Sequence, residues 1–448
     1  MAATQKQNSA PANQPLKFLF ALVAGLFFFV ATIKFGGPIV LDSLMPPPEN
    51  PLAAVFETWQ IKWGFYFMAP LVLIGLGAVD WRKLNFKWPL LLPIAWLGWQ
   101  FLSFTQSVSP TLSLLTLKYF AGCVALFYLG YFSMGGAKRA WPLWTGLGLA
   151  LCWMMRMGFE QHFGGLEASR KMAEQLKNGA DLPASYEARL ASTRIFSTFS
   201  NPDAFAGAIE LLLPVTLVFL WQITPKVRPA MRWAFVILLG WCGLASLYWT
   251  GSKGGWLVVI IMGSMALVRA TWPSKCWGKI GLGLLIAGVF FGTMKLHEHV
   301  TQHGGSGVYS LKKQQVSVST RLDYWGAALH ILAKRPILGS GPGTFSVAYA
   351  QVKHPASDFT RLCHNDYLEQ ACDSGLLGCI LYTTMVFGYL IWLYRSQAKK
   401  TSGRGVEFAM WLGIFGLALH SVVEYHLYIP ALAWPMFFLI GFLMNFEG

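Results

Sequence analysis

The chain has 448 residues, of which 55% are hydrophobic and only 12% are charged. A soluble domain carries about 25% charged residues, so this composition excludes a soluble cytosolic enzyme, a disordered regulator and a disulfide-rich scaffold. The net charge of +15 is spread along the chain instead of forming one basic block, which argues against nucleic acid as a partner. The remaining class is a polytopic membrane protein.

The first 16 residues are polar and lack the pattern of a cleaved signal peptide. We expect residues 1–16 to form a disordered cytoplasmic tail and residues 17–448 to form a single membrane domain. A helix needs about 20 mostly apolar residues to cross a bilayer, and scanning at that length predicts about 12 transmembrane helices. Strands of a membrane barrel would alternate apolar and polar residues, which these segments do not, so the predicted fold class is all-α. The segments lie near residues 17–37, 62–80, 87–105, 111–132, 140–158, 201–222, 232–249, 254–270, 279–296, 375–394, 406–423 and 429–445.

Lysine and arginine gather in alternate short loops, and positive charge in short loops stays in the cytoplasm. Both termini are therefore predicted to be cytoplasmic. Two long loops, 159–200 and 297–374, then lie on the outer side, where we expect short helices that cap an active site. The basic loop residues are Arg82, Lys83, Lys87, Lys138, Arg139, Lys226, Arg228, Arg232, Arg269, Lys275, Lys279, Arg395, Lys399, Lys400 and Arg404.

The second long loop contains the segment STRLDYWGAALHILAKRP. Ser319 or Thr320 is a suitable N-cap for a helix that Pro336 would stop. The spacing gives this helix an apolar face that consists of Leu322, Trp325, Leu329 and Leu332.

Several basic residues fall at the outer ends of the predicted spans, where the positive-inside rule does not explain them. Each one alone is compatible with snorkelling to the lipid headgroups. Taken together they outnumber the acidic residues nearby, which favours a site for a dianionic ligand such as a diphosphate. These residues are Lys34, Lys62, Lys118, Arg156, Lys253 and Lys295, with Arg194 and Arg321 in the adjoining loops.

Three other polar features have simpler explanations than a catalytic role. Glu210 lies within a predicted span and is expected to form an internal salt bridge or hydrogen bond. The cluster His297, His299 and His303 has a spacing that lacks a closed ligand set, so no metal site is predicted. The segment 339–344, GSGPGT, lacks the ending of a phosphate-binding loop and is predicted to be a tight turn.

His364 begins the segment HNDYLEQACDSGLLG, where the long outer loop meets the tenth span. By position alone, a helix-capping role is the simplest interpretation of this histidine. Asn365 and Asp366 follow it directly, and Gly375 and Gly378 allow close packing of helices.

This segment resembles the signature of the O-antigen ligase superfamily, H-[NSQ]-x9-G-x-x-G, which His364, Asn365, Gly375 and Gly378 match in full. The superfamily includes O-antigen ligases, O-antigen polymerases and protein O-oligosaccharyltransferases. Three weaker family patterns accompany it along residues 190–395. They are met by Lys253 in KGGWL, by Arg321 with Trp325 and PILGSG, and by Arg194 in RIFSTFSNP.

The resemblance implies an inverting glycosyltransferase of the bacterial inner membrane with a periplasmic active site. Its donor would be a glycan linked to undecaprenyl diphosphate, with no metal, nucleotide or other cofactor, and its partners would include membrane lipid. Its acceptor would be a hydroxyl of a glycan, of lipid A core or of another molecule. Lys253, Arg321 and Arg194 would stabilise the leaving diphosphate.

His364 would be the general base, because the ordinary pKa of histidine, near 6.5, suits proton transfer at neutral pH. Arg156, Tyr324, Asn365 and Asp366 are further candidates for binding substrate or orienting the base. A Wzy-type polymerase within the same family remains an alternative to a ligase. A lipid or solute transporter without chemistry is the alternative from another class, although transporters place ionisable groups near the midplane in paired repeats, which this chain lacks.

Overall fold

In the computed structural model, the described residues are 13–45, 48, 57–81, 87–137, 139–167, 192–271, 307–355, 357–398 and 405–446, and of 270–271, 307–319 and 397–398 only the backbone is described. All regular structure within these ranges is helical. The α-helices are α1 (Gln14–Lys34), α3 (Ile61–Ala78), α4 (Leu91–Phe104), α5 (Pro110–Tyr128), α6 (Trp141–Glu160), α9 (Pro202–Ile223), α10 (Pro229–Thr250), α11 (Lys253–Thr271), α13 (Gly307–Lys334), α14 (Phe345–Val352), α15 (Asp366–Thr383), α16 (Tyr389–Ala398), α17 (Gly405–His420) and α18 (Pro430–Asn445).

Shorter helical segments join or extend them. Three 3₁₀ turns are η1 (Ile39–Leu44), η3 (Trp88–Leu90) and η7 (His426–Tyr428). Three π-helical turns, η4 (Leu129–Ser133), η5 (Gln161–Gly165) and η6 (Thr384–Gly388), continue α5, α6 and α15.

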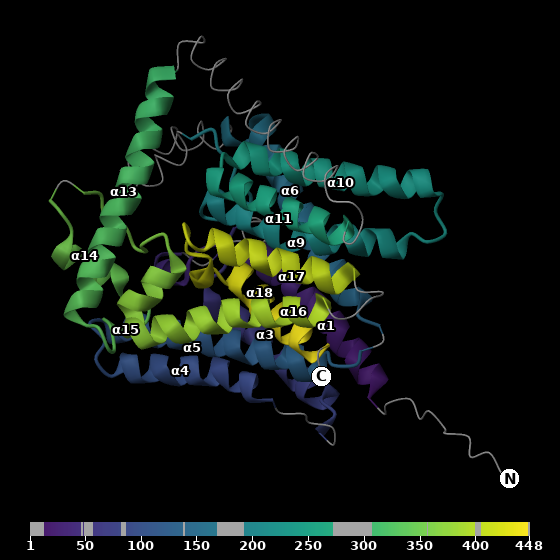
Figure 1. The fold of residues 1–448 in the computed structure, drawn as a ribbon, viewed down its shortest axis with the longest axis horizontal. Coiled ribbons are helices and arrows are strands. Elements are labelled where there is room, and N and C mark those ends of the chain that lie inside the picture. The colour runs from purple at the N-terminus through teal and green to yellow at the C-terminus, as the bar shows by residue number, and fades with distance from the viewer. Residues whose placement is uncertain are drawn as a thin grey trace.

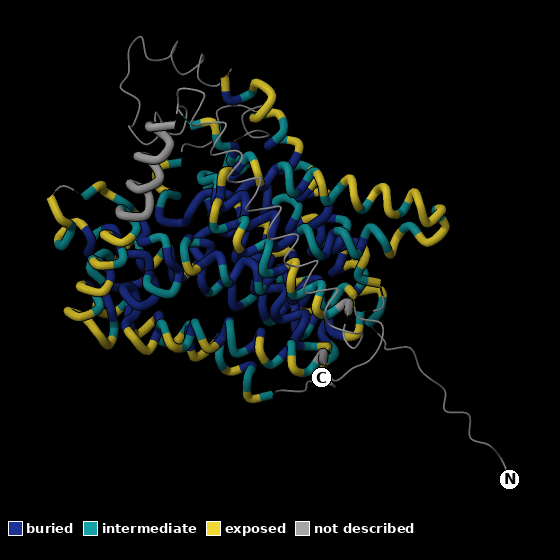
Figure 2. Tube along the Cα trace, turned by 45° about the horizontal axis from the view of Figure 1, so that its top comes forward, coloured by how far each residue is buried: buried dark blue, intermediate teal, exposed yellow. Residues whose placement is uncertain are grey.

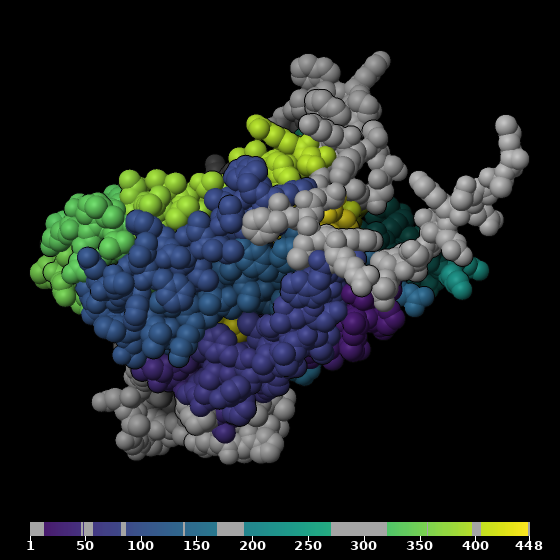
Figure 3. All heavy atoms as spheres, turned by 90° about the horizontal axis from the view of Figure 1, so that it is seen from below, coloured from purple at the N-terminus to yellow at the C-terminus, as the bar shows by residue number. Residues whose placement is uncertain are grey.

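Most helices run roughly parallel to one another, and α13 stands steeply across one end of the bundle beside α14 and α15 (Figure 1). Viewed from below in Figure 3, the N-terminal helices form one face of the molecule, with the green α13–α14 region at one end. Within the part of the chain that the structure describes, six helical segments are long and apolar enough to cross a membrane: α1, α3, α5 with η4, α9, α10, and α15 with η6 and α16 up to Ser396. The chain is therefore a helical membrane protein.

Helices coincide with the other predicted spans except 279–296, which lies outside the described residues. Those near 87–105, 140–158, 254–270, 406–423 and 429–445 fall on α4, α6, α11, α17 and α18. The count of 12 spans and the positions of the termini stay predictions.

The centre of the bundle is α18, in which every residue from Pro430 to Met444 is buried. A helix that is apolar all round belongs in such a position. Around it, glycines allow close backbone contact: a Cβ at Gly130 would collide with the backbone of Phe438, and one at Gly441 with the backbone of Phe127. Burial is concentrated in this centre (Figure 2), whereas α10 carries exposed apolar side chains along its length. That exposed surface is suited to contact with lipid.

Helix α13 differs from its prediction in its start and in its buried face. It begins at Gly307, so neither Ser319 nor Thr320 is its N-cap, although it does end at Lys334, just before Pro336. Leu322 and Leu329 are more than half exposed. The buried residues are Tyr324, Ala328 and Ile331, which pack near α14 and α15, and Trp325 of the expected face is partly buried against the same cluster. The spacing of the leucines does not mark the buried side of α13, because the face that carries Arg321 and Tyr324 is the one that packs toward the bundle.

Candidate active site

Glu424 is the buried centre of a polar network at the end of the bundle where α13 stands. It follows α17, in the turn before η7, and its side chain is 1% exposed. Three groups contact its carboxylate: the Nη2 of Arg321, the Nδ1 of His364 at 3.1 Å, and the Nδ2 of Asn201, which donates a hydrogen bond of 3.2 Å. Burial opposes ionisation of Glu424, but His364 and Arg321 outweigh it and hold the pKa of this carboxyl well below its ordinary value. Glu424 is therefore a fixed negative charge.

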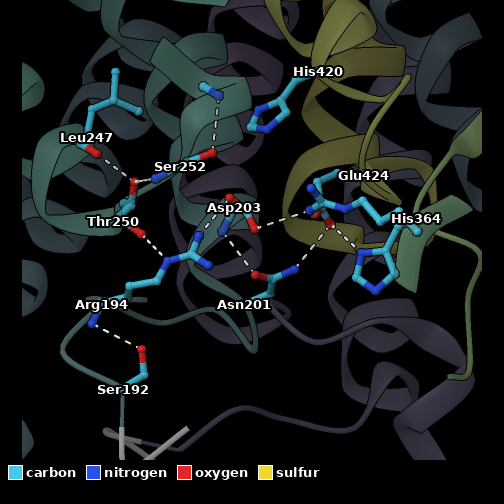
Figure 4. Close-up of polar contacts among 12 residues, drawn as sticks. Ser192, Arg194, Asn201, Asp203, Leu247, Thr250, Ser252, His364, His420 and Glu424 are labelled. Atoms are coloured by element: carbon cyan, nitrogen blue, oxygen red, sulfur yellow. Dashed lines mark hydrogen bonds and ion pairs between the residues drawn. The ribbon is translucent and has the colours of Figure 1, made fainter. Parts of the chain in front are cut away.

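Asp203, in the first turn of α9, is the second carboxylate of the network. Its Oδ1 accepts a hydrogen bond of 2.8 Å from Nη2 of Arg194, and its Oδ2 lies 3.7 Å from Nη2 of Arg321. The preceding Asn201 is the N-cap of α9, where its Oδ1 accepts from the backbone N–H of Asp203 at 3.0 Å. Asp203 and Glu424 thus hold Arg321 between them (Figure 4 shows both carboxylates).

Arg194 also joins this network to the turn between α10 and α11. Its Nε donates to the carbonyl of Thr250 at 2.5 Å (Figure 4). Gly251 adopts φ +61°, and a Cβ there would lie 3.3 Å from the Arg194 side chain, so the turn passes close under the guanidinium. Lys253 begins α11 two residues later, with its side chain exposed. The predicted cation at 253 therefore lies on the turn that binds Arg194.

His364 is held in place by the residues that follow it. Its own backbone has φ +55°, which is uncommon for a residue other than glycine and is found at functional sites that the surrounding structure over-determines. Asn365 is the N-cap of α15, accepting from the N–H groups of Tyr367 and Leu368 at 3.0 Å each. The backbone N–H of Asp366 donates to the carbonyl of Glu424 at 3.2 Å. The capping role expected for His364 thus belongs to Asn365.

Two aromatic rings flank the imidazole of His364. The ring of Tyr324 is nearly parallel to it at a centroid distance of 6.0 Å, and that of Tyr425 meets it edge-on at 4.8 Å. Burial, with nearby Tyr349, Asp358 and Asp323, raises the pKa of Tyr324 to about 12, so this phenol stays neutral at physiological pH.

The two nitrogens of the His364 imidazole differ in their contacts: Nδ1 contacts Glu424, and Nε2 does not. Nδ1 faces the ionised Glu424, so in the neutral ring it is the nitrogen that carries the proton and donates. Nε2 then carries the lone pair, and no hydrogen bond to it is found within the described ranges. With 23% of its side chain exposed, His364 is arranged to accept a proton from outside the network.

The other predicted site residues lie in less central positions. Arg156 of α6 pairs with Glu160 on the same helix at 3.4 Å, and both side chains are more than half exposed. The structure does not place Arg156 in the network of Glu424. Asp366 is fully buried, and its Oδ2 accepts from the backbone N–H of Leu427 at 2.8 Å. It joins the start of α15 to η7 and so supports the position of His364.

The expected tight turn at 339–344 is confirmed. Gly339, Gly341 and Gly343 all have positive φ. Asp373 of α15 binds this turn by accepting from the backbone N–H groups of Gly343 at 2.6 Å and Thr344 at 3.2 Å. The internal pairing expected of Glu210 is also confirmed, since its carboxylate contacts His420.

Sequence patterns did not identify Glu424, Asp203 or Asn201 as site residues. Glu424 was noticed only as part of the polar break between the last two predicted spans. An acidic residue next to two long apolar segments is costly unless it serves a site, and that is the signal that singles it out. The expectation that acidic partners are too few is wrong for Arg156, Arg194 and Arg321, because each contacts a carboxylate.

Metal ligation finds no support among the described residues, where no group of three or more His, Cys, Asp or Glu side chains is arranged to hold an ion. His297, His299 and His303 lie outside these residues.

The fold and the site together define a helical membrane protein with a histidine–carboxylate pair and two arginines at one end of its bundle. The sequence model of the O-antigen ligase family matches residues 238–383. The chain therefore carries, at these residues, a domain that matches the O-antigen ligase superfamily. Lys253, Arg321 and His364 fall within the match, whereas Arg194, Asp203 and Glu424 lie outside it. No curated protein matches the chain.

Proposed function

We propose that this protein is an O-antigen ligase-type glycosyltransferase that moves a glycan from undecaprenyl diphosphate to an acceptor hydroxyl on the periplasmic face of the inner membrane. The observation that carries the proposal is the sharing of one buried carboxylate, Glu424, by an arginine and a histidine. Both of these residues lie within the O-antigen ligase domain. The domain match supports the class of reaction, and the contacts of Glu424 support the roles of the two residues.

The donor's diphosphate is the leaving group in this scheme. As the bond between sugar C1 and the phosphate oxygen breaks, the electron pair moves to that oxygen and negative charge develops on it. Arg321 and Arg194 each direct Nη2 toward a carboxylate, and their side chains are 28% and 39% exposed. An arginine has five N–H donors, so both can meet phosphate oxygens while Asp203 and Glu424 fix their orientation. Lys253, at the start of α11 beside the turn that binds Arg194, adds a third positive charge to the site.

The acceptor is the nucleophile, and His364 is the base. The acceptor oxygen forms the new bond to C1 on the face opposite the departing phosphate, and its proton passes to Nε2 of His364. Glu424 stabilises the imidazolium that results, as the buried carboxylate does in a Ser-His-Asp triad. One such displacement inverts the configuration at C1, and it needs neither metal nor nucleotide.

Purified protein with an undecaprenyl-diphosphate-linked glycan tests this proposal. We expect a glycan product when lipid A core is the acceptor, with unchanged yield in the presence of EDTA. A product formed only with a second lipid-linked glycan would identify a polymerase instead. If no product forms and the lipid-linked glycan instead crosses the membrane of proteoliposomes that contain the protein, the protein is a transporter and not a glycosyltransferase.

A further inference from the structure

A second histidine–carboxylate pair lies deeper in the bundle than the first. Nδ1 of His420, the last residue of α17, is 3.0 Å from Oε1 and 3.1 Å from Oε2 of Glu210 in α9. The two side chains are 1% and 0% exposed, so neither meets substrate. A buried ion pair is weak evidence for stability, because well-packed apolar side chains in its place are often equally stabilising. The presence of this buried pair therefore points to a role other than stabilising the fold.

The first turn of α11 rests directly on the pair. A Cβ at Gly254 would lie 3.1 Å from Nε2 of His420, and a Cβ at Gly255 would lie 3.1 Å from Oε1 of Glu210. Such distances are tighter than nearly all real Cβ contacts, so the two glycines let the backbone approach the pair. The Oγ of Ser252 accepts from the backbone N–H of Gly255 at 3.1 Å and caps this turn (Figure 4). Lys253 is the residue between the cap and the two glycines.

The same pair is connected to both carboxylates of the candidate active site. Asp203 precedes Glu210 by about two turns of α9, on the same face of that helix. His420 precedes Glu424 by four residues, and its carbonyl accepts from the N–H of Val423 at 3.0 Å. The pair thus joins α9, α11 and the turn after α17, which carry Asp203, Lys253 and Glu424.

We infer that Glu210 and His420 form a positioning pair that sets Lys253 relative to Asp203 and Glu424, and so aligns the cations for the leaving diphosphate. This inference rests on the proposed function. The pair acts through the backbone of α11 and through the 420–424 turn, and neither member touches the reacting atoms. Small displacements of aligned groups are costly in catalysis, since a shift of about 1 Å lowers rates by about 100-fold.

Gly254→Ala tests the contact without removing a charge, and Gly263→Ala is its matched control. Both residues lie in α11, but an added Cβ at Gly263 has nothing within 4 Å. We expect Gly254→Ala to lower kcat by about 10- to 100-fold, with an unchanged KM for the acceptor, while Gly263→Ala keeps wild-type kinetics. Equal thermal unfolding of the two variants in detergent verifies that both are folded. Wild-type kinetics for Gly254→Ala would overturn the inference.

A double-mutant cycle between Glu210→Gln and Lys253→Met separates positioning from general destabilisation. If the pair acts by placing Lys253, the double variant is as active as the less active of the two single variants. A merely structural loss would multiply with that of Lys253→Met, which would overturn the inference. His364→Ala in the same assay tests the proposed function by itself. Full activity there refutes the base, whereas lost activity with a multiplicative cycle refutes only the positioning pair.

Discussion

The two histidine–carboxylate pairs of this bundle have nearly the same hydrogen bond and different surroundings. Nδ1 of His364 lies 3.1 Å from Glu424, and Nδ1 of His420 lies 3.0–3.1 Å from Glu210. His364 is 23% exposed and shares its carboxylate with Arg321, whereas His420 is 1% exposed and faces the backbone at Gly254. The surroundings of Nε2, the imidazole nitrogen that does not contact the carboxylate, therefore determine what such a pair can do. His364, with 23% of its side chain exposed, can take a proton, whereas His420, whose Nε2 faces the backbone at Gly254, can only hold other groups in place.

The strongest test of this distinction is His364→Ala. Removing a general base costs about 10²- to 10⁴-fold in rate, so we expect glycan transfer to fall by that factor while binding of the lipid-linked donor persists. Transfer is measured from the glycan product by mass spectrometry, and donor binding from co-purified lipid. Transfer at the wild-type rate would remove His364 from the mechanism.

Arg321→Ala is expected to have the next largest effect. Loss of one preorganised group that stabilises a developing negative charge costs about 10²- to 10³-fold in kcat. This variant also leaves Glu424 without its arginine, so the protein should unfold at a lower temperature. Arg335→Ala is the control, because Arg335 directly follows the same helix and its Nη1 donates to the carbonyl of Gln106 at 3.1 Å, away from Glu424. Equal rates for the two variants would contradict the role of Arg321.

Glu424→Gln keeps a hydrogen-bonding group of the same shape and removes the charge that stabilises the imidazolium. A hydrogen bond to a charged group is worth about 1.5–3 kcal/mol, which corresponds to a loss of about 10- to 100-fold in kcat. Glu210→Gln makes the matched change in the covered pair and should leave the pH dependence of kcat unaltered. The distinction between the two pairs fails if both variants alter that pH dependence equally.

Glu424→Gln also makes a prediction about acid stability. The native pKa of Glu424 is lowered, so its charge stabilises the folded protein above the ordinary glutamate pKa of about 4.3, and this stabilisation is lost as the pH falls toward the native pKa. The difference in unfolding temperature between wild type and Glu424→Gln should therefore be largest near neutral pH and shrink below about pH 4. A difference that grows on acidification would mean that Glu424 is protonated in the folded protein.

Arg156→Ala is expected to have the smallest effect. Its ion pair with Glu160 is exposed, and such pairs contribute about 0–1 kcal/mol to stability. Transfer rates should stay within about twofold of wild type, since surface changes of this kind lie within about 0.5 kcal/mol. A large loss of donor binding would instead show that Arg156 reaches substrate.

The sequence predicted the elements of this molecule better than their contacts. Apolar segments near residues 17–37, 201–222 and 232–249 coincide with α1, α9 and α10 within a few residues, because membrane helices are specified by local hydropathy. The family motifs singled out His364 and Arg321, and the structure places both side chains against the carboxylate of Glu424. Their catalytic roles stay predictions. Local patterns sufficed for these features.

The residues that contact His364 and Arg321 could not be predicted from local sequence patterns. Glu424 lies 60 residues from His364 and 103 from Arg321, and only the folded arrangement of α13, α15 and α17 brings the three together. The expected apolar face of α13 is only partly buried, for a related reason. Its exposed Leu322 and Leu329 look like core residues when the helix is considered without its neighbours.

The configuration of the new glycosidic bond is the most direct test of the central claim. A donor of known anomeric configuration, incubated with the purified wild-type protein and its acceptor, gives a product whose C1 configuration can be read by NMR. A single displacement with His364 as the base predicts inversion at C1. Retention cannot arise from a single displacement on the opposite face of C1 and would contradict the account.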